Sequence, residues 1–460
     1  MAIPVEPPQL PLLLTDVPDR GLRDRLEPVV DVRALLPALE TSGDAVAVQV
    51  LDGDRKTVVR LLHERPATVA DGPARIAGRL RLMPVRGYDA EAAAVGRRLS
   101  EAGLTLQPAG TGYSAALDQA GLLPDLSPRV VLDADLPAVT AVGWVLLSFL
   151  DEIELTLEGT IEDVDTEFLH DFRVSVRRSR AIVKLLAEVL PPALATWAGQ
   201  ELKWLGDLTT PVRDLDVHLL EVPAAAARLA GADPADLAPL TEYLNRLRAV
   251  ERRRLLRGLG SARFQRFRSR WRESLEALST IAEESVPATG SATGPTAESA
   301  TEFTTESATV PAAELGARSL ARADRRVTEP GSKITPDSPA AALHDLRKRC
   351  KELRYLLEVF APLMDPADAR GAVKELKALQ DVLGTFQDTE VQREALYTFA
   401  ADMLARGSAS ARTLLAMGQV AGRLHDQQEA ARADFESRFA AFADPSVQRR
   451  MTGLSKARAR

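Results

Sequence analysis

Two stretches of the sequence place a histidine and a row of basic residues at the spacing of one helical stripe. The first row is His170, Arg173, Arg177, Arg180 and Lys184. The second row is His344, Arg347, Lys351 and Arg354. Because each residue of a helix advances by roughly 100°, the members of a row share one helix face. Arginine donates paired hydrogen bonds to anionic oxygens and lysine adds a compact charge, so the chemistry that these rows predict is anion binding.

An apolar stripe runs beside each basic row. It consists of Phe172, Val176 and Val183 in the first stretch, and of Leu346, Cys350, Leu353 and Leu357 in the second. A helix with one apolar face packs that face against a core. Each stretch is therefore predicted to be a core-packed helix with cations beside its buried face. The histidine of each row can donate a hydrogen bond when neutral or add a charge when protonated, and the residues leave both forms open.

The two stretches belong to a longer internal repeat. His344 follows His170 by 174 residues, and the same offset relates Glu201-Leu202-Lys203 to Glu375-Leu376-Lys377. It also relates Asp207 to Asp381, Asp214 to Asp388 and Val217 to Val391. One register over two separate motifs indicates a tandem duplication, with a period too long for a solenoid. The predicted fold class is mainly α, with two pseudo-symmetric antiparallel helical bundles whose basic rows face each other.

Composition limits the class of protein. The chain has 460 residues and a net charge of −7, so it is long enough for two or three domains and is not basic overall. A basic site must then be local. One cysteine excludes an intrachain disulfide and suits a reducing cytoplasm, where we expect the protein. The longest apolar run, 139–150, falls short of the roughly 20 residues that span a bilayer, and the N-terminus has no basic region of a signal peptide, so we expect no membrane partner.

The N-terminal residues 1–128 are predicted to be a small α+β domain. Alternating apolar residues predict a hairpin at Ala45–Leu51 and Lys56–His63 and a strand at Ile76–Met83. A helix follows at Ala90–Ala102 and ends at Gly103, a residue type common after a helix.

The remainder of the chain has the helical period. Helices are predicted near 136–158, 165–188, 192–209, 212–230, 233–258, 261–284, 313–328, 338–361, 366–383, 386–405 and 408–442. We divide them into a first bundle, 129–285, and a second bundle, 313–447. The segment 286–312 between them is rich in Ala, Thr, Ser and Pro and predicts a disordered linker, and 448–460 is a basic tail.

The repeated motifs resemble a known family. The pattern H-D-x-R-x₃-[RK]-x₂-R occurs twice, and each copy precedes L-x-x-L-x-D-x₅-[RQ]-D-x-[DE]-V, at Leu202–Val217 and Leu376–Val391. This arrangement resembles the CHAD family, the "conserved histidine α-helical domain". The resemblance implies two four-helix bundles around a basic channel that binds inorganic polyphosphate, in a protein associated with polyphosphate granules and their proteins.

The resemblance also implies which residues bind polyphosphate. The matching positions are His170, Arg173, Arg177, Arg180, Lys203, Arg213, His344, Arg347, Lys351, Arg354 and Lys377. Lys184, Lys348 and Lys374 are further cations close to them. Gln387 stands where the first copy has Arg213, so that corner of the second copy is expected to contribute less.

The N-terminal domain has a weaker resemblance. Leu80–Tyr88, the Ala-rich helix after it, Leu104–Pro108 and Gly112-Tyr113 are similar to the second half of a CYTH domain, the triphosphate-tunnel barrel. That family holds a divalent metal with glutamates on its strands, beginning with an E-x-E-x-K strand. This sequence has no such strand, and Arg79 and Arg81 replace a later acidic pair. We therefore expect a degenerate domain with no metal, no cofactor and no catalysis.

Other interpretations remain at this stage. The protein could be a metal-dependent triphosphatase of the CYTH type, or an adaptor that binds nucleic acid, which the net charge disfavours. The basic rows could be solvated faces paired with acidic neighbours, and the two histidines could ligate a metal. Asp214 and Asp388 read as helix-starting or arginine-pairing residues, and Cys350 as a packed thiol.

Overall fold

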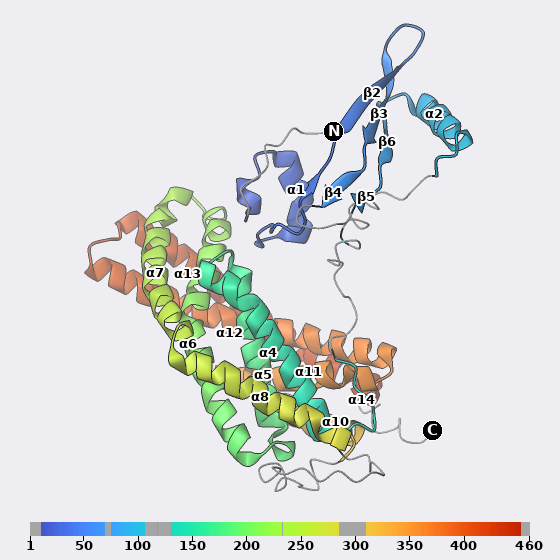
Figure 1. Ribbon diagram of the computed structural model, residues 1–460. Helices are drawn as coiled ribbons and strands as arrows, with labels where there is room; N and C mark the ends of the chain where they lie inside the picture. Colours follow the sequence, from blue (N-terminus) through green and yellow to red (C-terminus); the bar gives the residue numbers. More distant parts are fainter. Residues whose placement is uncertain are drawn as a thin grey trace, which may run out of the picture. The chain divides into compact units, whose positions relative to one another are not determined.

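The structure is a computed structural model that describes residues 11–69, 75–105, 117, 130–231, 233–284 and 310–451 (Figure 1). The chain forms two compact units, Met1–Pro128 and Arg129–Arg460. Most of the predicted linker 286–312 and residues 452–460 of the predicted tail lie outside the described residues. None of the described helices is both long and apolar enough to cross a membrane.

The first unit contains short helices and two small antiparallel sheets. Its helices are η1 (Leu14–Asp16), α1 (Arg20–Val30) and α2 (Asp89–Glu101). One sheet has the order β2 (Ala45–Leu51), β3 (Thr57–Glu64), β6 (Arg79–Pro84). The other has the order β1 (Thr41–Ser42), β4 (Ala67–Val69), β5 (Arg75–Ile76), and these strands of two or three residues are too short to leave an alternating pattern in the sequence.

The larger sheet confirms the predicted hairpin, third strand and following helix, and it has two different faces. α2 covers one face, where Leu61 lies opposite Leu82 and Val59 is fully buried. On the opposite face, Arg79 and Arg81 both pair with Glu64, and Arg81 Nε lies 3.0 Å from Glu64 Oε1. The apolar core of this unit is small, and the other face of the sheet carries charge.

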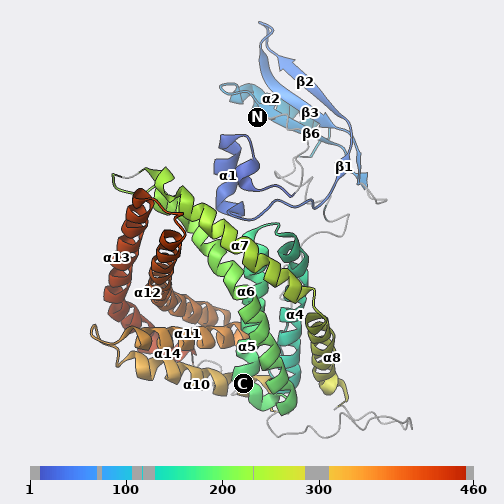
Figure 2. The ribbon, with the colours of Figure 1, turned by 90° about the vertical axis from the view of Figure 1, so that its left-hand side faces the viewer.

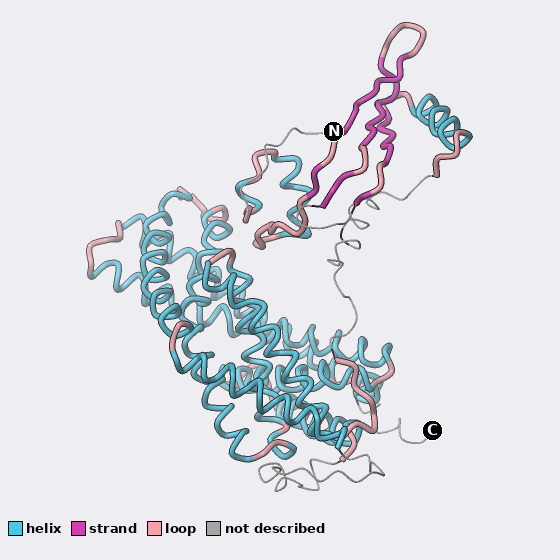
Figure 3. The backbone as a smooth tube through the Cα atoms, in the orientation of Figure 1, coloured by secondary structure: helices cyan, strands magenta, loops and turns pink. Residues whose placement is uncertain are grey.

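The second unit consists of helices joined by loops in its described residues (Figures 1 and 3). Its first half comprises α4 (Ala138–Glu162), α5 (Thr166–Leu185), η2 (Ala187–Val189), α6 (Pro192–Ala226), η3 (Pro234–Leu237), α7 (Ala238–Leu259) and α8 (Ala262–Glu284). Its second half comprises α10 (Ala312–Gly331), α11 (Ala340–Phe360), η4 (Ala361–Leu363), α12 (Pro366–Ala405), α13 (Ala411–Phe442) and α14 (Pro445–Met451). Figure 2 shows α6 beside α7 and α12 beside α13.

Two predicted helix breaks are wrong. α6 continues through Pro211, and α12 continues through Gly384. Proline inside a helix costs about 3 kcal/mol and removes one backbone donor. In α6, burial of Leu202, Leu205, Leu208 and Val212 along one face outweighs that cost, because a side chain of this size gains roughly 1.5–3 kcal/mol on burial.

The 174-residue offset extends to elements that the motifs do not include. η4 begins at Ala361 and α12 at Pro366, 174 residues after η2 and α6 begin at Ala187 and Pro192. Both long helices start with proline, which has no donor to lose at that position. The two halves therefore repeat the order of helix, short 3₁₀ turn and long helix in one register.

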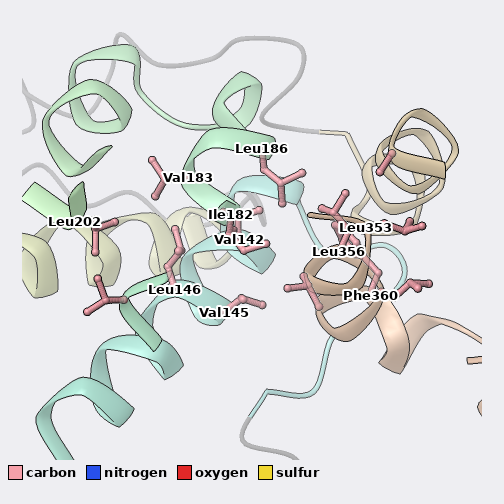
Figure 4. Packing of buried hydrophobic residues seen from close by; sticks show 14 of the residues in the cluster. Val142, Val145, Leu146, Ile182, Val183, Leu186, Leu202, Leu353, Leu356 and Phe360 are labelled. Carbon is pink, nitrogen blue, oxygen red and sulfur yellow. The ribbon is translucent and has the colours of Figure 1, made fainter. Parts of the chain in front are cut away.

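A continuous apolar core joins the two halves. Figure 4 shows Val142, Ile182 and Leu186 of the first half packed near Leu356 and Phe360 of the second. A separate core cluster joins α6 and α7 to α12 and α13, where Leu215 and Leu244 pack with Leu396 and Met403. The halves are thus held together at two places, and the basic rows lie near the first.

Candidate anion-binding cavity

Local sequence fixes the orientation of α5 and α11. Asp165 caps α5, because its Oδ1 accepts hydrogen bonds from the backbone N–H groups of Glu167 (2.8 Å) and Phe168 (3.1 Å). Phe172, Val176 and Val183 are buried, as are all four members of the predicted apolar stripe of α11. Both apolar stripes are therefore confirmed, and the basic rows lie on the less buried faces of their helices.

α5 and α11 meet through polar contacts between the halves. Arg177 Nε donates to Tyr355 Oη at 3.0 Å. Two ion pairs accompany this bond, Arg178 with Glu358 at 3.1 Å and Lys184 with Glu352 at 2.8 Å. We call these three contacts the α5–α11 seam.

A cavity of about 600 Å³ lies beside this seam. α5 lines it with His170, Arg177 and Arg178, and α11 lines it with Arg347, Lys351, Arg354 and Tyr355. α12 forms much of the remaining wall, which includes Gln380, Asp381, Asp388 and Gln392, and α6 adds Glu221. The cavity thus brings cations of both basic rows together, as the repeat predicted, and three carboxylates stand among them.

Lys351 differs from Arg347 and Arg354 because it makes no ion pair in the described structure, although the charge of Asp388 acts on it. It forms no ion pair or hydrogen bond with any residue that the structure describes, whereas Arg347 pairs with Asp388 at 2.8 Å and Arg354 with Glu358 at 2.7 Å. Burial, and after it the charges of Arg347 and Arg177, lowers the pKa of Lys351 to about 8. The folded protein therefore destabilises the protonated, positively charged form of Lys351 relative to a lysine in water.

Arg173, the repeat equivalent of Arg347, does not line the cavity. Its Nη1 donates to Thr210 Oγ1 at 2.8 Å and to Thr209 Oγ1 at 3.0 Å on α6. Burial lowers the pKa of Arg173 to about 10, and the nearby cations Arg177 and Arg213 add to the effect. In this structure Arg173 connects α5 to α6.

The two histidines have different surroundings. His170 lines the cavity, and its pKa is lowered by burial and then by Arg213. His344 lies outside the cavity lining and its Nδ1 is hydrogen-bonded to Gln387 Oε1. His170 thus lies near the charged Arg213, whereas His344 is bonded to the uncharged Gln387 at the equivalent position of the second half.

One group near His170 has the composition of a metal site. Ligand atoms of Glu167, His170 and Asp171 lie within 4.8 Å of one another. Arg213 Nη1 is 3.4 Å from Glu167 Oε1 and also donates to the Thr166 carbonyl at 3.1 Å. The guanidinium already neutralises one of the three ligands, so this arrangement favours an internal ion pair over a divalent cation.

The other predicted site residues lie outside the cavity lining. Lys203 pairs with Asp207 and Lys348 with Asp345, in both cases within one helix, and Lys184 belongs to the α5–α11 seam. Arg180, Lys374 and Lys377 are exposed. None of these six cations lines the cavity.

Several residues that line the cavity were not predicted as site residues from the sequence. Arg178 is adjacent to the predicted row but off its stripe, and Tyr355 directly follows Arg354. The repeat motif contains Asp388, which pairs with Arg347, whereas Gln392 has no signal in the sequence. Asp214 and Asp388 do not start helices, because both lie within long ones, but the alternative prediction of a pair with arginine is confirmed for Asp388. Cys350 is fully buried and its pKa is raised to about 12 by burial, as a packed thiol requires.

The helical unit is similar in sequence to known proteins. Residues 145–397, more than half of the chain, match the CHAD domain family. The uncharacterized protein Rv2226 of Mycobacterium tuberculosis is 26% identical over 304 residues, which are 65% of this chain and 52% of that protein. The chain therefore spans about half the length of the curated relative it matches.

The helical unit also resembles solved structures. The crystal structure of the CHAD domain from the plant Ricinus communis superposes with a TM-score of 0.54 and 24% identity, over 70% of this chain and 97% of that one. PptA from Streptomyces chartreusis gives a TM-score of 0.48 and 18% identity, over 66% of this chain and 99% of that one. The first of these likenesses shows the fold of the helical unit.

Proposed function

The chain belongs to the CHAD domain family, and from that premise we propose that it binds inorganic polyphosphate in the cavity between α5, α11 and α12. The observation that carries this proposal is Lys351, a half-buried cation that makes no ion pair in the described structure and lies among Arg177, Arg347 and Arg354. A buried charge is costly unless an opposite charge accompanies it. A polyanion would supply that charge, and each phosphate unit would bring about one negative charge and several acceptor oxygens.

The carboxylates of the cavity are compatible with this ligand. Asp388 already pairs with Arg347, and Glu221 accepts a hydrogen bond from Gln392 Nε2 at 2.8 Å. Burial raises the pKa of Glu221, and the charge of Asp388 raises it further. Both acids therefore already have a hydrogen-bonded partner within the protein.

We also propose that the two halves are related by an approximate twofold axis through the α5–α11 seam. Arg178 corresponds to Glu352 in the repeat, and Lys184 corresponds to Glu358. The two ion pairs, Arg178–Glu358 and Lys184–Glu352, are therefore exchanged by the repeat, as in an isologous interface. The bridge between Pro137 and Pro311, which are also 174 residues apart, supports the same axis.

For the first unit, we propose a degenerate triphosphate-tunnel domain without catalysis. Arg79 and Arg81 share the single carboxylate of Glu64, so the charged face of this sheet is cationic and disfavours a divalent metal. Under this proposal the protein binds polyphosphate without catalysing a reaction. It would therefore be located where its ligand accumulates, at cytoplasmic polyphosphate granules. The competing function is a metal-dependent triphosphatase.

Titration of the full chain with polyphosphate of defined length tests the main proposal, with single-stranded DNA and RNA as competing ligands. We expect saturable binding of polyphosphate that is tighter than that of either nucleic acid at each salt concentration. Equal affinity for RNA would show a general polyanion binder, and absence of polyphosphate binding would refute the proposal. Release of phosphate from tripolyphosphate in the presence of Mg²⁺ or Mn²⁺ would favour the triphosphatase.

A matched pair of variants tests the site. Lys351→Met removes the unpaired cavity cation, and we expect binding to weaken by roughly 10- to 100-fold, because a hydrogen bond to a charged group contributes about 1.5–3 kcal/mol. Lys374→Met removes an exposed lysine of α12 outside the cavity lining and should change the affinity by less than about threefold. Equal effects of the two substitutions would place the ligand elsewhere.

A further inference from the structure

A second pocket adjoins the basic cavity at the other contact between the halves. Its volume is about 280 Å³, and it lies between the C-terminal part of α6, η3, α7, α12 and α13. It shares Glu221, Gln392 and Gln427 with the basic cavity. The rest of its wall is mainly apolar, with Val222, Leu240, Leu396, Val420 and Leu424. The two neighbouring spaces therefore suit different chemistry.

Two arginines line this apolar pocket without a counterion. Arg228 and Arg423 make no ion pair or side-chain hydrogen bond with any residue of the described ranges. Nη1 of Arg423 is buried and has no hydrogen-bond partner there. Leaving a buried donor unsatisfied costs about 1–3 kcal/mol, and more when the group is charged. The one acid in the lining, Glu221, is hydrogen-bonded to Gln392 instead.

We propose that this pocket binds a small amphipathic organic anion. Its apolar body would lie against Leu240, Leu396 and Val420, and its carboxylate or phosphate head would accept hydrogen bonds from Arg423 and Arg228. Small-molecule sites have this make-up, a mostly apolar wall with a few polar groups that fix the orientation of the ligand. An inorganic polyanion does not match the apolar wall, so this ligand differs from the one proposed for the basic cavity.

The histidine of the pocket is compatible with a ligand that has a single anionic head. His218 lines the same pocket, and burial lowers its pKa, so it adds no charge at neutral pH. Its ring is held edge-on to Phe399 at 5.3 Å between centroids. The pocket thus offers two guanidinium groups, a neutral imidazole, the carboxylate of Glu221 and an apolar wall. This inference does not depend on polyphosphate binding.

Calorimetric titration of the full chain with octanoate and octyl phosphate tests the proposal, with octanol and octylamine as probes of the same length without a negative charge. We expect saturable binding of at least one anion, at least about tenfold tighter than octanol, because the difference reports hydrogen bonds to charged groups. Failure of both anions to bind, or equal affinity for octanol, would overturn the proposal.

Variants locate the ligand. Arg423→Met should lower anion affinity about tenfold or more and bring it to the level of octanol, whereas Arg412→Met, at the exposed start of α13, should change neither. Leu240→Trp should fill the pocket and abolish binding, and Val420→Phe provides a second filling variant if the first does not fold. Equal effects of the two arginine substitutions, or binding that survives filling of the pocket in a folded variant, would exclude this site. Polyphosphate affinity in Arg423→Met, measured in parallel, keeps the two proposed sites distinguishable.

Discussion

At the scale of single residues, equivalent positions of the repeat have different environments. Arg347 and Lys351 line the cavity, while Arg173 is tied to Thr209 and Thr210 on α6. Sequence type alone made Arg173 and Arg347 equal candidates. Their difference arises from which groups of the neighbouring long helix lie within hydrogen-bond reach. Among the arginines and the lysine that line the described cavity, only Lys351 makes neither an ion pair nor a hydrogen bond.

The lowered pKa of Lys351 predicts a pH dependence of binding. A bound polyanion favours the protonated amine, so affinity for polyphosphate should fall as the pH rises through about 8, the pKa of Lys351 in the free protein. Above that pH, formation of the complex should take up a proton. Binding measured calorimetrically in buffers of different ionisation enthalpy, between about pH 7 and about pH 9.5, checks both effects.

The same group affects stability with a defined sign. Lys351 has a lower pKa in the folded state than the 10.5 of an ordinary lysine, so between about 8 and 10.5 the unfolded chain binds more protons. Its contribution to the free energy of unfolding should therefore rise with pH in that window.

The variant Lys351→Arg tests the pH dependence of binding. Its side chain stays charged, so the fall in polyphosphate affinity near pH 8 should be lost. An unchanged pH profile in this variant would assign the effect to another residue.

At the scale of elements, contacts between helices override local preferences. α6 contains Pro211 and α12 contains Gly384, yet both helices continue, because each packs one apolar side along its length. The α5–α11 seam in turn joins cations of one helix to carboxylates of the other. Two predictions concern these helix contacts.

The first concerns the charge of the seam. Lys184→Glu would place a carboxylate against Glu352 and should lower the free energy of unfolding by roughly 0.5–1 kcal/mol, because this pair is partly exposed. Arg180→Glu changes the same charge one turn earlier on α5, at an exposed position without an ion pair in the described structure, and should be nearly neutral. Urea unfolding of both variants measures the difference. Equal destabilisation would mean that net charge, and not the seam, is responsible.

The second concerns the close approach of α4 and α5. A Cβ at Gly159 would overlap the ring of Phe168, whereas a Cβ at Gly199 in α6 would meet nothing within 4 Å. We expect Gly159→Ala to destabilise the protein by about 1–3 kcal/mol through overpacking. Gly199→Ala should be neutral or stabilise it by up to about 1 kcal/mol, because alanine favours the helix. Thermal unfolding of the two variants distinguishes these outcomes, and a stable Gly159→Ala protein would show that the ring can move aside.

At the scale of the second unit, the two halves meet at two places and the proposed sites lie between them. One contact is the core around α4, α5 and α11, and the other joins α6 and α7 to α12 and α13. The basic cavity and the apolar pocket share residues of α6, α12 and α13. Residues far apart in the sequence therefore meet only when both halves have folded together.

A net charge of −7 for the whole chain does not prevent polyanion binding if the positive charge is local. We expect the logarithm of the polyphosphate association constant to fall linearly with the logarithm of salt concentration, as counterions are released. Lys351→Met should reduce the size of this slope by about one, while Lys374→Met should leave it nearly unchanged. Affinities measured at a series of NaCl concentrations provide the test. Identical slopes for all three proteins would argue against a phosphate contact at Lys351.

The sequence by itself determined the features that depend on local spacing. The basic rows, the buried stripes led by Phe172 and Leu346, and the 174-residue register all follow from helical period and repetition. These properties are local, because side chains three or four residues apart share a helix face whatever lies opposite. The match to the CHAD family, over residues 145–397, includes both copies of these motifs.

Only the tertiary structure decided which side chains face one another. His170 lines the cavity but His344 does not, Glu352 and Glu358 neutralise cations of α5, and Arg423 reaches an apolar pocket. Each of these facts joins residues more than 150 positions apart or depends on packing between helices, for which periodicity carries no signal. Spacing within a helix could predict a row of cations, but it could not show that Arg178 and Lys184 of α5 pair with carboxylates of the other half.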